Sequence, residues 1–363
     1  MIVKDWIEGH TGQHLEEVDA DLGIEIEVEG VNLPSRVGES WRVDRDGSLR
    51  GESYEYVSKP IKYSELTSTL DQLKDAYRRS DSVVHESIRA GVHVHRNVQN
   101  FTPVQLFNLS ISYFAIEDLL MKWAGENREG NHFCLRAKDG EFVLFQLQRV
   151  ADTRLIRHLN TDTIRYCSLN LYSLFKYGTV EFRGMRGTAN LDAIKLWTEM
   201  IYALTENSKR FLDPLDIIMS MSGSGEDSFL RTLLPDHHAL LTYPGYETDI
   251  RDSIRRLQFI ANTTNWSEFE SKIKVKQPVS KNVDMGMRLG DFAIVAGGGR
   301  INAPPGWDVE PLGAQAVRDP LAHQEEILRQ AANPRGRPAR PAPMPAPEPV
   351  MFFDEVDELP DEI

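Results

Sequence analysis

Three short segments of the chain alternate apolar residues with residues whose side chains can bind cations or phosphate. Residues 23–29, G-I-E-I-E-V-E, would place Glu25, Glu27 and Glu29 together on one face of an extended strand. Like charges that adjoin on a strand face destabilise it unless something neutralises them, and a divalent cation would do so. A plain edge strand with a solvated acidic face explains this segment equally well.

Two further segments repeat the alternation. G-V-H-V-H puts the imidazoles of His93 and His95 opposite two valines, which suits metal or phosphate ligands but is also common on ordinary surfaces. T-V-E-F-R puts Glu181 and Arg183 on one face, with an ion-paired surface strand as the alternative. Together the three segments predict a sheet with one side packed on helices and one side lined with ligands. Carboxylates and imidazoles without cysteine suit Mg²⁺ or Mn²⁺, and an arginine among them suits phosphate oxygens.

Three other segments could extend such a site. Asp46 and Ser48 lie in a predicted turn whose acidic and hydroxyl groups could hold the amino group of a substrate. Glu55 lies in a short predicted strand that ends before Pro60. Arg165 precedes the T-V-E-F-R strand by a hairpin-like distance and could add a second cation for phosphate. For Asp46 and Arg165, an ordinary turn or ion-pair role fits equally well.

Helices are predicted where apolar residues recur with helical spacing. Thr102 and Pro103 form an N-cap and a first-turn proline for a helix that continues to Trp123 and should lie against the sheet. Residues 206–275 also have a helical pattern. The predicted apolar stripes are Leu66, Leu70, Leu73 and Tyr77; Ile194, Trp197, Ile201 and Leu204; and Ile250, Ile254, Leu257 and Ile260.

The composition is that of an acidic globular protein. The 41 basic and 55 acidic residues give a formal net charge of −14, which argues against binding nucleic acid or an anionic membrane. Cys134 and Cys167 are the only cysteines, so neither a disulfide framework nor a zinc knuckle is expected. The chain starts without a signal-peptide pattern and has no run of about 18 apolar residues. These features favour a cytoplasmic protein without a membrane span.

We expect four parts along the chain. Residues 1–20 are interpreted as an N-terminal extension and residues 21–275 as a catalytic domain that ends in helices. Residues 276–332 are predicted to be a poorly structured extension, and residues 333–363 a disordered tail, rich in proline and then acidic. Docking of this tail on a protein partner and a solvated tail without a partner are equally consistent with its composition.

In content and order, the motifs resemble those of the amidoligases of the carboxylate-amine ligase superfamily, relatives of glutamine synthetase and glutamate-cysteine ligase. The resemblance covers residues 21 to about 205. It implies an α+β fold, in which a curved antiparallel sheet has a polar concave active-site face and helices on its other face. The matching motifs are G-I-E-I-E at 23–27, D-G-S-L at 46–49, E-Y-V-S-K-P at 55–60, H-V-H at 93–95 and T-V-E-F-R at 179–183.

The resemblance further implies an ATP-dependent ligase that joins a small-molecule or peptide carboxylate to an amine through an acyl phosphate. It also allows for a homo-oligomer. Glutamine synthetase has a second carboxylate near the position of Glu55, for which Glu52 and Glu29 are the candidates here. The alternatives are an inactive ATP- or peptide-binding module and a phosphotransferase. By motif position, the ligands for Mg²⁺ or Mn²⁺ would be Glu25, Glu27, Glu55, His93 and Glu181. The catalytic residues would be Arg183, Glu181 and His95, and the ATP-binding residues would be Arg183, Arg165 and His93. Asp46 and Ser48 would bind the substrate.

Overall fold

The computed structural model describes residues 1–85, 87–125, 128 and 130–274. The predicted extension and tail, residues 276–363, lie outside the described residues. All described residues belong to one compact unit. It has an α+β fold, as predicted, built around an open sheet of seven strands in which every pair is antiparallel. Within the described residues, no helix combines the length and the apolar character that crossing a membrane requires.

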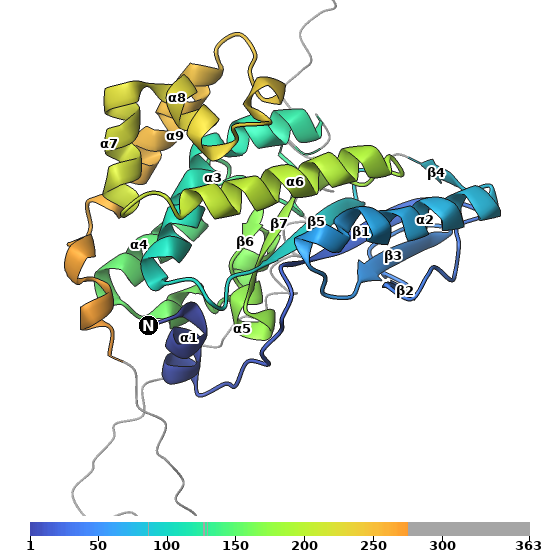
Figure 1. Cartoon of the computed structure of the whole chain (residues 1–363), viewed down its shortest axis with the longest axis horizontal. Helices are drawn as coiled ribbons and strands as arrows, with labels where there is room; N and C mark the ends of the chain where they lie inside the picture. The colour runs from blue at the N-terminus through green and yellow to red at the C-terminus, as the bar shows by residue number, and fades with distance from the viewer. Residues whose placement is uncertain (86, 126–127, 129, 275–363) are drawn as a thin grey trace, which may run out of the picture. The chain divides into compact units, whose positions relative to one another are not determined.

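The sheet has the strand order β2-β3-β1-β5-β7-β6, and β4 pairs with β1 outside this path (Figure 1). The alternating segments correspond to β1, β5 and β7, and the strand predicted before Pro60 corresponds to β3. The sequence pattern misses the short strands β2 and β4. The bounds are β1 Leu22–Val31, β2 Trp41–Asp44, β3 Ser53–Ser58, β4 Val83–His85, β5 Gly91–Asn97, β6 Leu169–Asn170 and β7 Thr179–Arg186.

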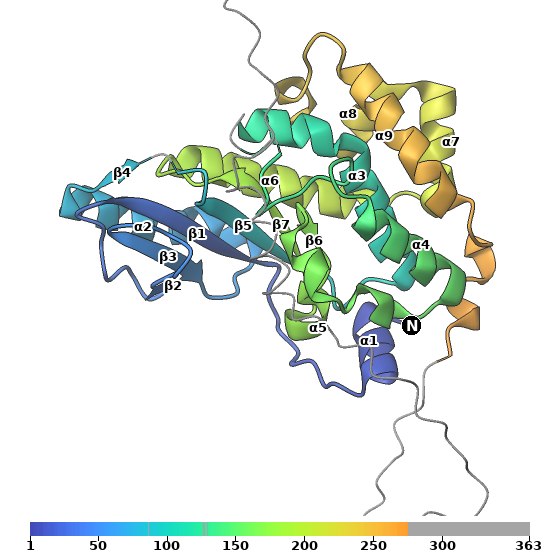
Figure 2. The same cartoon turned by 180° about the vertical axis from the view of Figure 1, so that it is seen from behind.

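Helices cover one face of the sheet. In Figure 1, α2 and α6 cross in front of the sheet, and in Figure 2, seen from behind, β1 and β3 lie nearer the viewer than these helices. The longest helix, α3, contacts both α6 and β7. The bounds are α1 Val3–Thr11, α2 Leu66–Ser80, α3 Pro103–Ala124, α4 Phe142–Thr153, α5 Ser173–Tyr177, α6 Leu191–Ser208, α7 Pro214–Ser224, α8 Glu226–Leu233 and α9 Tyr246–Ala261.

The predicted helix signals are confirmed. Thr102 caps α3 because its hydroxyl accepts from the backbone N–H of Gln105 (3.3 Å), while the Gln105 side chain accepts from the N–H of Thr102 (3.0 Å). The three predicted apolar stripes are buried on α2, α6 and α9. They pack in the core as expected for amphipathic helices.

The apolar face of the sheet forms the centre of this core. Ile24, Ile26 and Val28 of β1 are fully buried, and the apolar residues of β5 and β7 lie in the same cluster. The alternate residues of these strands therefore point to the opposite face. The first 20 residues also contribute, because Trp6 and Ile7 of α1 are fully buried in the core. The Trp6 ring N–H donates to the carbonyl of Arg154 (3.1 Å).

Candidate functional site

The register of the sheet brings the predicted polar residues together on the face opposite the helices. Directly paired positions of antiparallel strands place their side chains on the same face, within contact distance. Residues far apart in the sequence become neighbours in this way. The paired positions are Glu25 with His93, Glu27 with Glu55, and His95 with Glu181.

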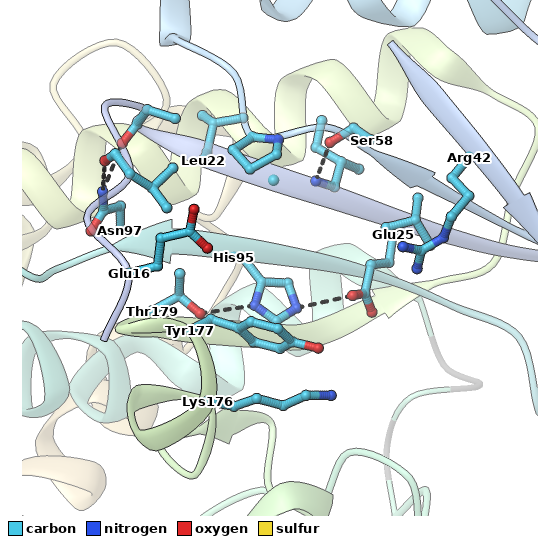
Figure 3. Close-up of a pocket in the computed structure, with 16 residues that line it drawn as sticks. Glu16, Leu22, Glu25, Arg42, Ser58, His95, Asn97, Lys176, Tyr177 and Thr179 are labelled. Atoms are coloured by element: carbon cyan, nitrogen blue, oxygen red, sulfur yellow. Dashed lines mark hydrogen bonds and ion pairs between the residues drawn. The ribbon is translucent and has the colours of Figure 1, made fainter. Parts of the chain in front are cut away.

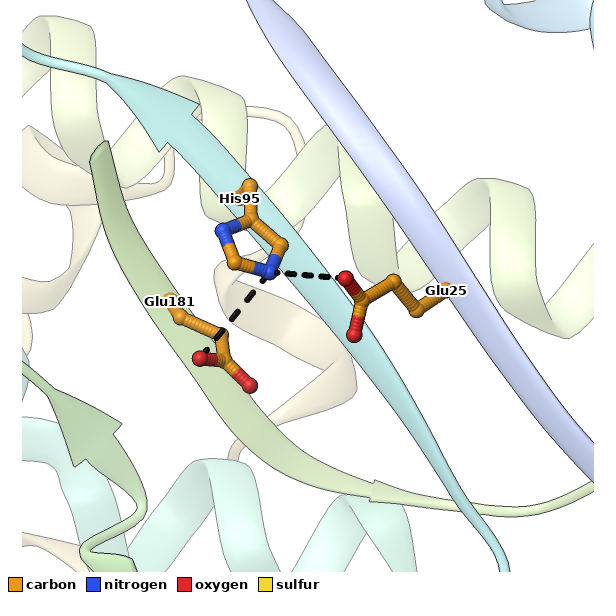
Figure 4. Close-up of side chains that lie close together, drawn as sticks. All are labelled: Glu25, His95 and Glu181. Carbon is orange, nitrogen blue, oxygen red and sulfur yellow. Dashed lines mark ion pairs between the residues drawn. The ribbon is translucent and has the colours of Figure 1, made fainter. Parts of the chain in front are cut away.

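Glu25, His95 and Glu181 form a first cluster, shown in Figure 4. The Nε2 atom of His95 lies 3.3 Å from Oε1 of Glu25 and 3.9 Å from Oε2 of Glu181. His93 lies against the same carboxylates, with its Nδ1 atom 3.4 Å from Oε2 of Glu25 and 3.6 Å from Oε1 of Glu181. One cation could contact ligand atoms from all three strands here, because the atoms of the first cluster lie within 4.8 Å of one another.

The contacts of His95 would suit a metal ligand. Its Nδ1 atom lies 3.0 Å from Oγ1 of Thr179, and its buried Nε2 atom lies 3.3 Å from Oε1 of Glu25 (Figure 3). With a cation bound among the carboxylates and the proton on Nδ1 donated to Thr179, Nε2 would present its lone pair to that cation. Histidines that bind metals are commonly held this way through the other ring nitrogen. The donor set of carboxylates and imidazole fits Mg²⁺ or Mn²⁺.

The charges of the first cluster stabilise one another. Burial alone would raise the pKa of Glu25, but hydrogen bonds and the charges of His93 and His95 hold this pKa far below its usual range. Burial also opposes the charged form of His95, yet the carboxylates of Glu181 and Glu25 raise its pKa above the ordinary value. A cation in the cluster would take over the role of these imidazolium charges.

Glu27, Asp46 and Glu55 form a second cluster, whose carboxylate oxygens lie within 4.8 Å of one another. Glu27 is held in place by the backbone N–H of Gly91, which donates to its Oε2 atom (2.8 Å). Burial, followed by the charges of the carboxylates around it, raises the pKa of Glu55 to about 7. Such crowding of acids is relieved when a divalent cation binds.

The third acid of the second cluster comes from the turn after β2. The resemblance to glutamine synthetase suggests Glu52 or Glu29 for a further carboxylate near Glu55. In the structure, however, Glu52 accepts from the N–H of Leu33 (2.7 Å) and Glu29 from the N–H of Arg50 (2.8 Å). The carboxylate of Asp46 adjoins Glu55 and Glu27, whereas the sequence suggests that Asp46 holds the amino group of a substrate.

Arg183 supplies a cation next to the first cluster. Its Nη1 atom donates to Oε1 of Glu181, and its Nε atom donates to the carbonyl of Phe133 (3.2 Å). Burial lowers the pKa of Arg183, but the adjacent carboxylate of Glu181 outweighs it and raises this pKa. The other oxygen of Glu181 accepts from the side-chain amide of Asn170 (2.6 Å). Glu181 is thus fixed from both sides.

Two predicted residues are not brought into these clusters. Arg165 is exposed, where it pairs with Asp162 (3.5 Å) and stacks on Tyr166. Ser48 is exposed as well, and its backbone N–H donates to Oδ1 of Asp46 (2.6 Å). Ser48 therefore shapes the turn that presents Asp46.

A pocket of about 270 Å³ adjoins the first cluster (Figure 3). Glu25 and His95 form part of its wall, and Tyr177 packs edge-on against the His95 ring at 5.7 Å. The exposed ammonium group of Lys176 lies over the Tyr177 ring, 4.7 Å from its centroid. The other lining residues are Glu16, Val18, Ala20, Leu22, Gly23, Ile24, Arg42, Val57, Ser58, Pro60, Asn97 and Thr179. The wall thus combines apolar residues with polar groups of both charges, as in many small-molecule sites.

Several residues around the clusters carry no assigned role from the sequence. Thr179 is on the same alternating face as Glu181, so the strand pattern contains a signal for it. Asn170 stands in β6, two residues long, where no periodicity exists to indicate its direction. Arg128 lies outside the named helices and strands, and only the fold brings it near the sheet.

Part of the chain matches a protein-family model. Residues 36–205 match a family described as "Putative amidoligase enzyme". The matched range includes β2 to β7, but it begins after β1, which carries Glu25 and Glu27. A comparison with curated proteins found no match.

Proposed function

We propose that the chain is an ATP-dependent carboxylate-amine ligase with a divalent-metal site, and the match of residues 36–205 to the amidoligase family supports this proposal. The observation that carries the proposal is the pair of acidic clusters on one face of the sheet. The first joins two carboxylates to a buried imidazole and adjoins the half-buried guanidinium of Arg183. The proposed substrates are a small-molecule or peptide carboxylate and an amine.

The chemistry explains why such a site needs many cationic contacts. ATP and a carboxylate are both anions, so their negative charges must be neutralised before the carboxylate can attack the γ-phosphate. Mg²⁺ or Mn²⁺ would supply this neutralisation when bound, held by Glu25, His95 and Glu181 at one position and by Glu27, Asp46 and Glu55 at the other. The attack forms an acyl phosphate and releases ADP, and the amine then displaces phosphate to form the amide.

The protein's own residues would orient the reactants. A guanidinium has five N–H donors, and Arg183 uses two of its donor atoms within the described residues, so others can donate to phosphate oxygens. We place the nucleoside of ATP in the pocket beside the first cluster, with the Tyr177 ring against it and the phosphates toward Glu25 and His95. The carboxylate substrate would then approach from the second cluster.

The proposal is tested by measuring ADP and mass-shifted products together. The full-length protein is incubated with ATP, Mg²⁺ or Mn²⁺, and paired panels of amino acids and peptides as carboxylate and amine. We expect ADP release that requires both partners and a product that has lost one water. ADP formation without an amine, with a phosphorylated product, would instead identify a phosphotransferase. The absence of ATP binding would refute the enzyme and favour an interaction module.

Variants connect this activity to the site. Glu25→Gln and Arg183→Ala should each lower turnover by about 10²-fold or more, because each removes a charge aimed at the reacting phosphate or its cation. Glu29→Gln is the matched control for Glu25→Gln: it makes the same change on the same face of β1, outside both clusters. Wild-type turnover in Glu25→Gln or Arg183→Ala would remove that residue from the mechanism.

A further inference from the structure

Arg128 is one of the largest fully buried side chains of the molecule, with 1% of its surface exposed. Its Nη1 atom donates to the carbonyl of Ala90 (3.2 Å) and its Nη2 atom to the carbonyl of Arg183 (2.7 Å). Its Nε atom is buried without a hydrogen-bond partner among the described residues. Neutral carbonyls satisfy donors but do not cancel a charge, so the guanidinium is buried without an ion-pair partner in the described part of the chain.

The guanidinium lies at the edge of the proposed metal site. Gly91 has no side chain, and the position that its Cβ would occupy lies 3.0 Å from Nε2 of His93, 3.1 Å from Nη2 of Arg128 and 3.5 Å from Oε2 of Glu27. The three groups therefore surround one point next to Gly91. The same Oε2 atom of Glu27 accepts the Gly91 N–H. Arg128 thus stands beside the second cluster without touching it.

The two carbonyls that Arg128 contacts fix the backbone on both sides of this point. The pairing of β5 with β7 shifts register between Val92 and Val94, so that two residues of β7 stand opposite His93 alone. A bulge of this kind leaves backbone groups outside the ladder. Arg128 satisfies one of them, the carbonyl of Arg183, and also holds Ala90, which precedes the Gly91 N–H that contacts Glu27.

We propose that Arg128 is a positioning residue that supplies a permanent positive charge to the acidic site, keeping its carboxylates together before a divalent cation arrives and weakening the binding of that cation. The proposal rests on the proposed function, because it needs the second cluster to bind a metal ion. A fixed cation next to Glu27 offsets the mutual repulsion of the carboxylates. The same cation repels a divalent ion that enters the cluster.

Arg128 could instead act only by holding the backbone carbonyls of Ala90 and Arg183 in place. The two roles predict opposite changes in metal affinity when Arg128 loses its charge. Replacing Arg128 by methionine removes the charge but keeps a long side chain, so the divalent ion should bind more tightly. Replacing it by lysine keeps the charge but loses the planar fork that reaches both carbonyls. A clamp without an electrostatic role predicts weaker metal binding in both variants, because each loses the contacts that order Gly91 and Arg183.

The experiment titrates full-length wild type, Arg128→Met and Arg128→Lys with Mn²⁺ alone, with free Mn²⁺ followed by electron paramagnetic resonance. Circular dichroism melting is used to confirm that each variant is folded. We expect Arg128→Met to bind Mn²⁺ about tenfold more tightly than wild type and Arg128→Lys to stay within about threefold of it. Arg149→Met, the same change at an exposed position on α4, is the matched control and should match the wild type.

The possible results separate this inference from the proposed function. Mn²⁺ binding by the wild type, together with equal or weaker binding by Arg128→Met, would overturn the role of Arg128 and leave the proposed function standing. A wild type that does not bind Mn²⁺ would overturn both. If Arg128→Met does not fold, the comparison of Arg128→Lys with wild type decides: loss of Mn²⁺ affinity despite the retained charge contradicts the proposal, and wild-type affinity supports it.

Discussion

The buried carboxyl of Glu117 makes the stability of the protein depend on pH. Glu117 lies on α3, where its Oε2 atom accepts from the N–H of Ala137 (2.8 Å) and its Oε1 atom contacts the hydroxyl of Ser168. The Ser168 carbonyl in turn accepts the N–H of Arg183 (2.8 Å), so Glu117 lies behind the strand that carries this arginine. Burial outweighs both hydrogen bonds and raises the pKa of Glu117 to about 8.

The size and sign of the effect follow from this pKa. An unfolded glutamate has a pKa of 4.5, so between that value and about 8 the folded chain holds a proton that the unfolded chain releases. The free energy of unfolding contributed by Glu117 is therefore fully present below pH 4.5 and is lost as the pH rises through about 8. Each pKa unit corresponds to about 1.4 kcal/mol, which gives about 5 kcal/mol over the whole window.

Glu117→Gln should remove this dependence, because the amide has the same shape and cannot ionise. Its oxygen can accept the Ala137 N–H, and its nitrogen can donate to the Ser168 hydroxyl. We expect the variant and the wild type to have similar free energies of unfolding at pH 4.5. At pH 8 the variant should be more stable by up to about 5 kcal/mol.

Urea unfolding followed by circular dichroism at several pH values between 4.5 and 8 measures this difference. Subtracting the wild-type curve from the variant curve cancels the contributions of all other titrating groups. Glu39→Gln, at an exposed glutamate, is the control and should run parallel to the wild type. Parallel curves for Glu117→Gln and wild type would refute the assignment of a retained proton to Glu117.

Two further predictions concern the metal clusters. Thr179→Val removes the hydroxyl that holds Nδ1 of His95, so Mn²⁺ affinity should fall about 10- to 100-fold in a Mn²⁺ titration, whereas Thr179→Ser should retain it. An unchanged affinity in Thr179→Val would contradict the orienting role. Asp46→Asn should reduce the number of bound Mn²⁺ ions from two to one in equilibrium dialysis, and Asp44→Asn, its matched control in the preceding strand, should keep both. If Asp46→Asn still binds two ions, Asp46 is not a metal ligand, and the role that the sequence suggests, holding the amino group of a substrate, is favoured.

Local patterns predict the faces of the strands well but not the partners of each side chain. Alternation puts Glu25 and Glu27 on one face of β1, and the structure confirms that Ile24 and Ile26 occupy the other. Which glutamate joins which cluster depends on the pairing with β3 and β5, and that pairing is a property of the sheet as a whole. The sequence accordingly identifies the acids, and the register sorts them into two groups.

Residues outside periodic elements show the limit of sequence reasoning most clearly. Asp46 lies near Glu27 and Glu55 because β2, a strand of four residues, pairs with β3 and places Asp44 opposite Glu55. A strand so short has no measurable period. The role proposed for Arg128 cannot be predicted from the sequence either. That role depends on the burial of its charge, and distant parts of the chain decide whether a residue outside the named elements is buried. Its type alone predicts an exposed side chain.

A bulge in the pairing of β5 with β7 changes which face of the sheet the end of β7 occupies. Strict alternation from Glu181 would put Met185 on the polar face, yet Met185 is buried and pairs with Val92. The extra residue therefore returns the end of β7 to the core after Arg183 has been presented to the site. A Cβ at Gly184 would come within 2.8 Å of the Met121 sulfur and 3.3 Å of the Trp197 ring, so a side chain here would require these neighbours to shift. A glycine inside a strand pattern commonly marks a bulge. The motif T-V-E-F-R thus depends on the glycine that follows it, which lets one strand serve both the polar site and the apolar core.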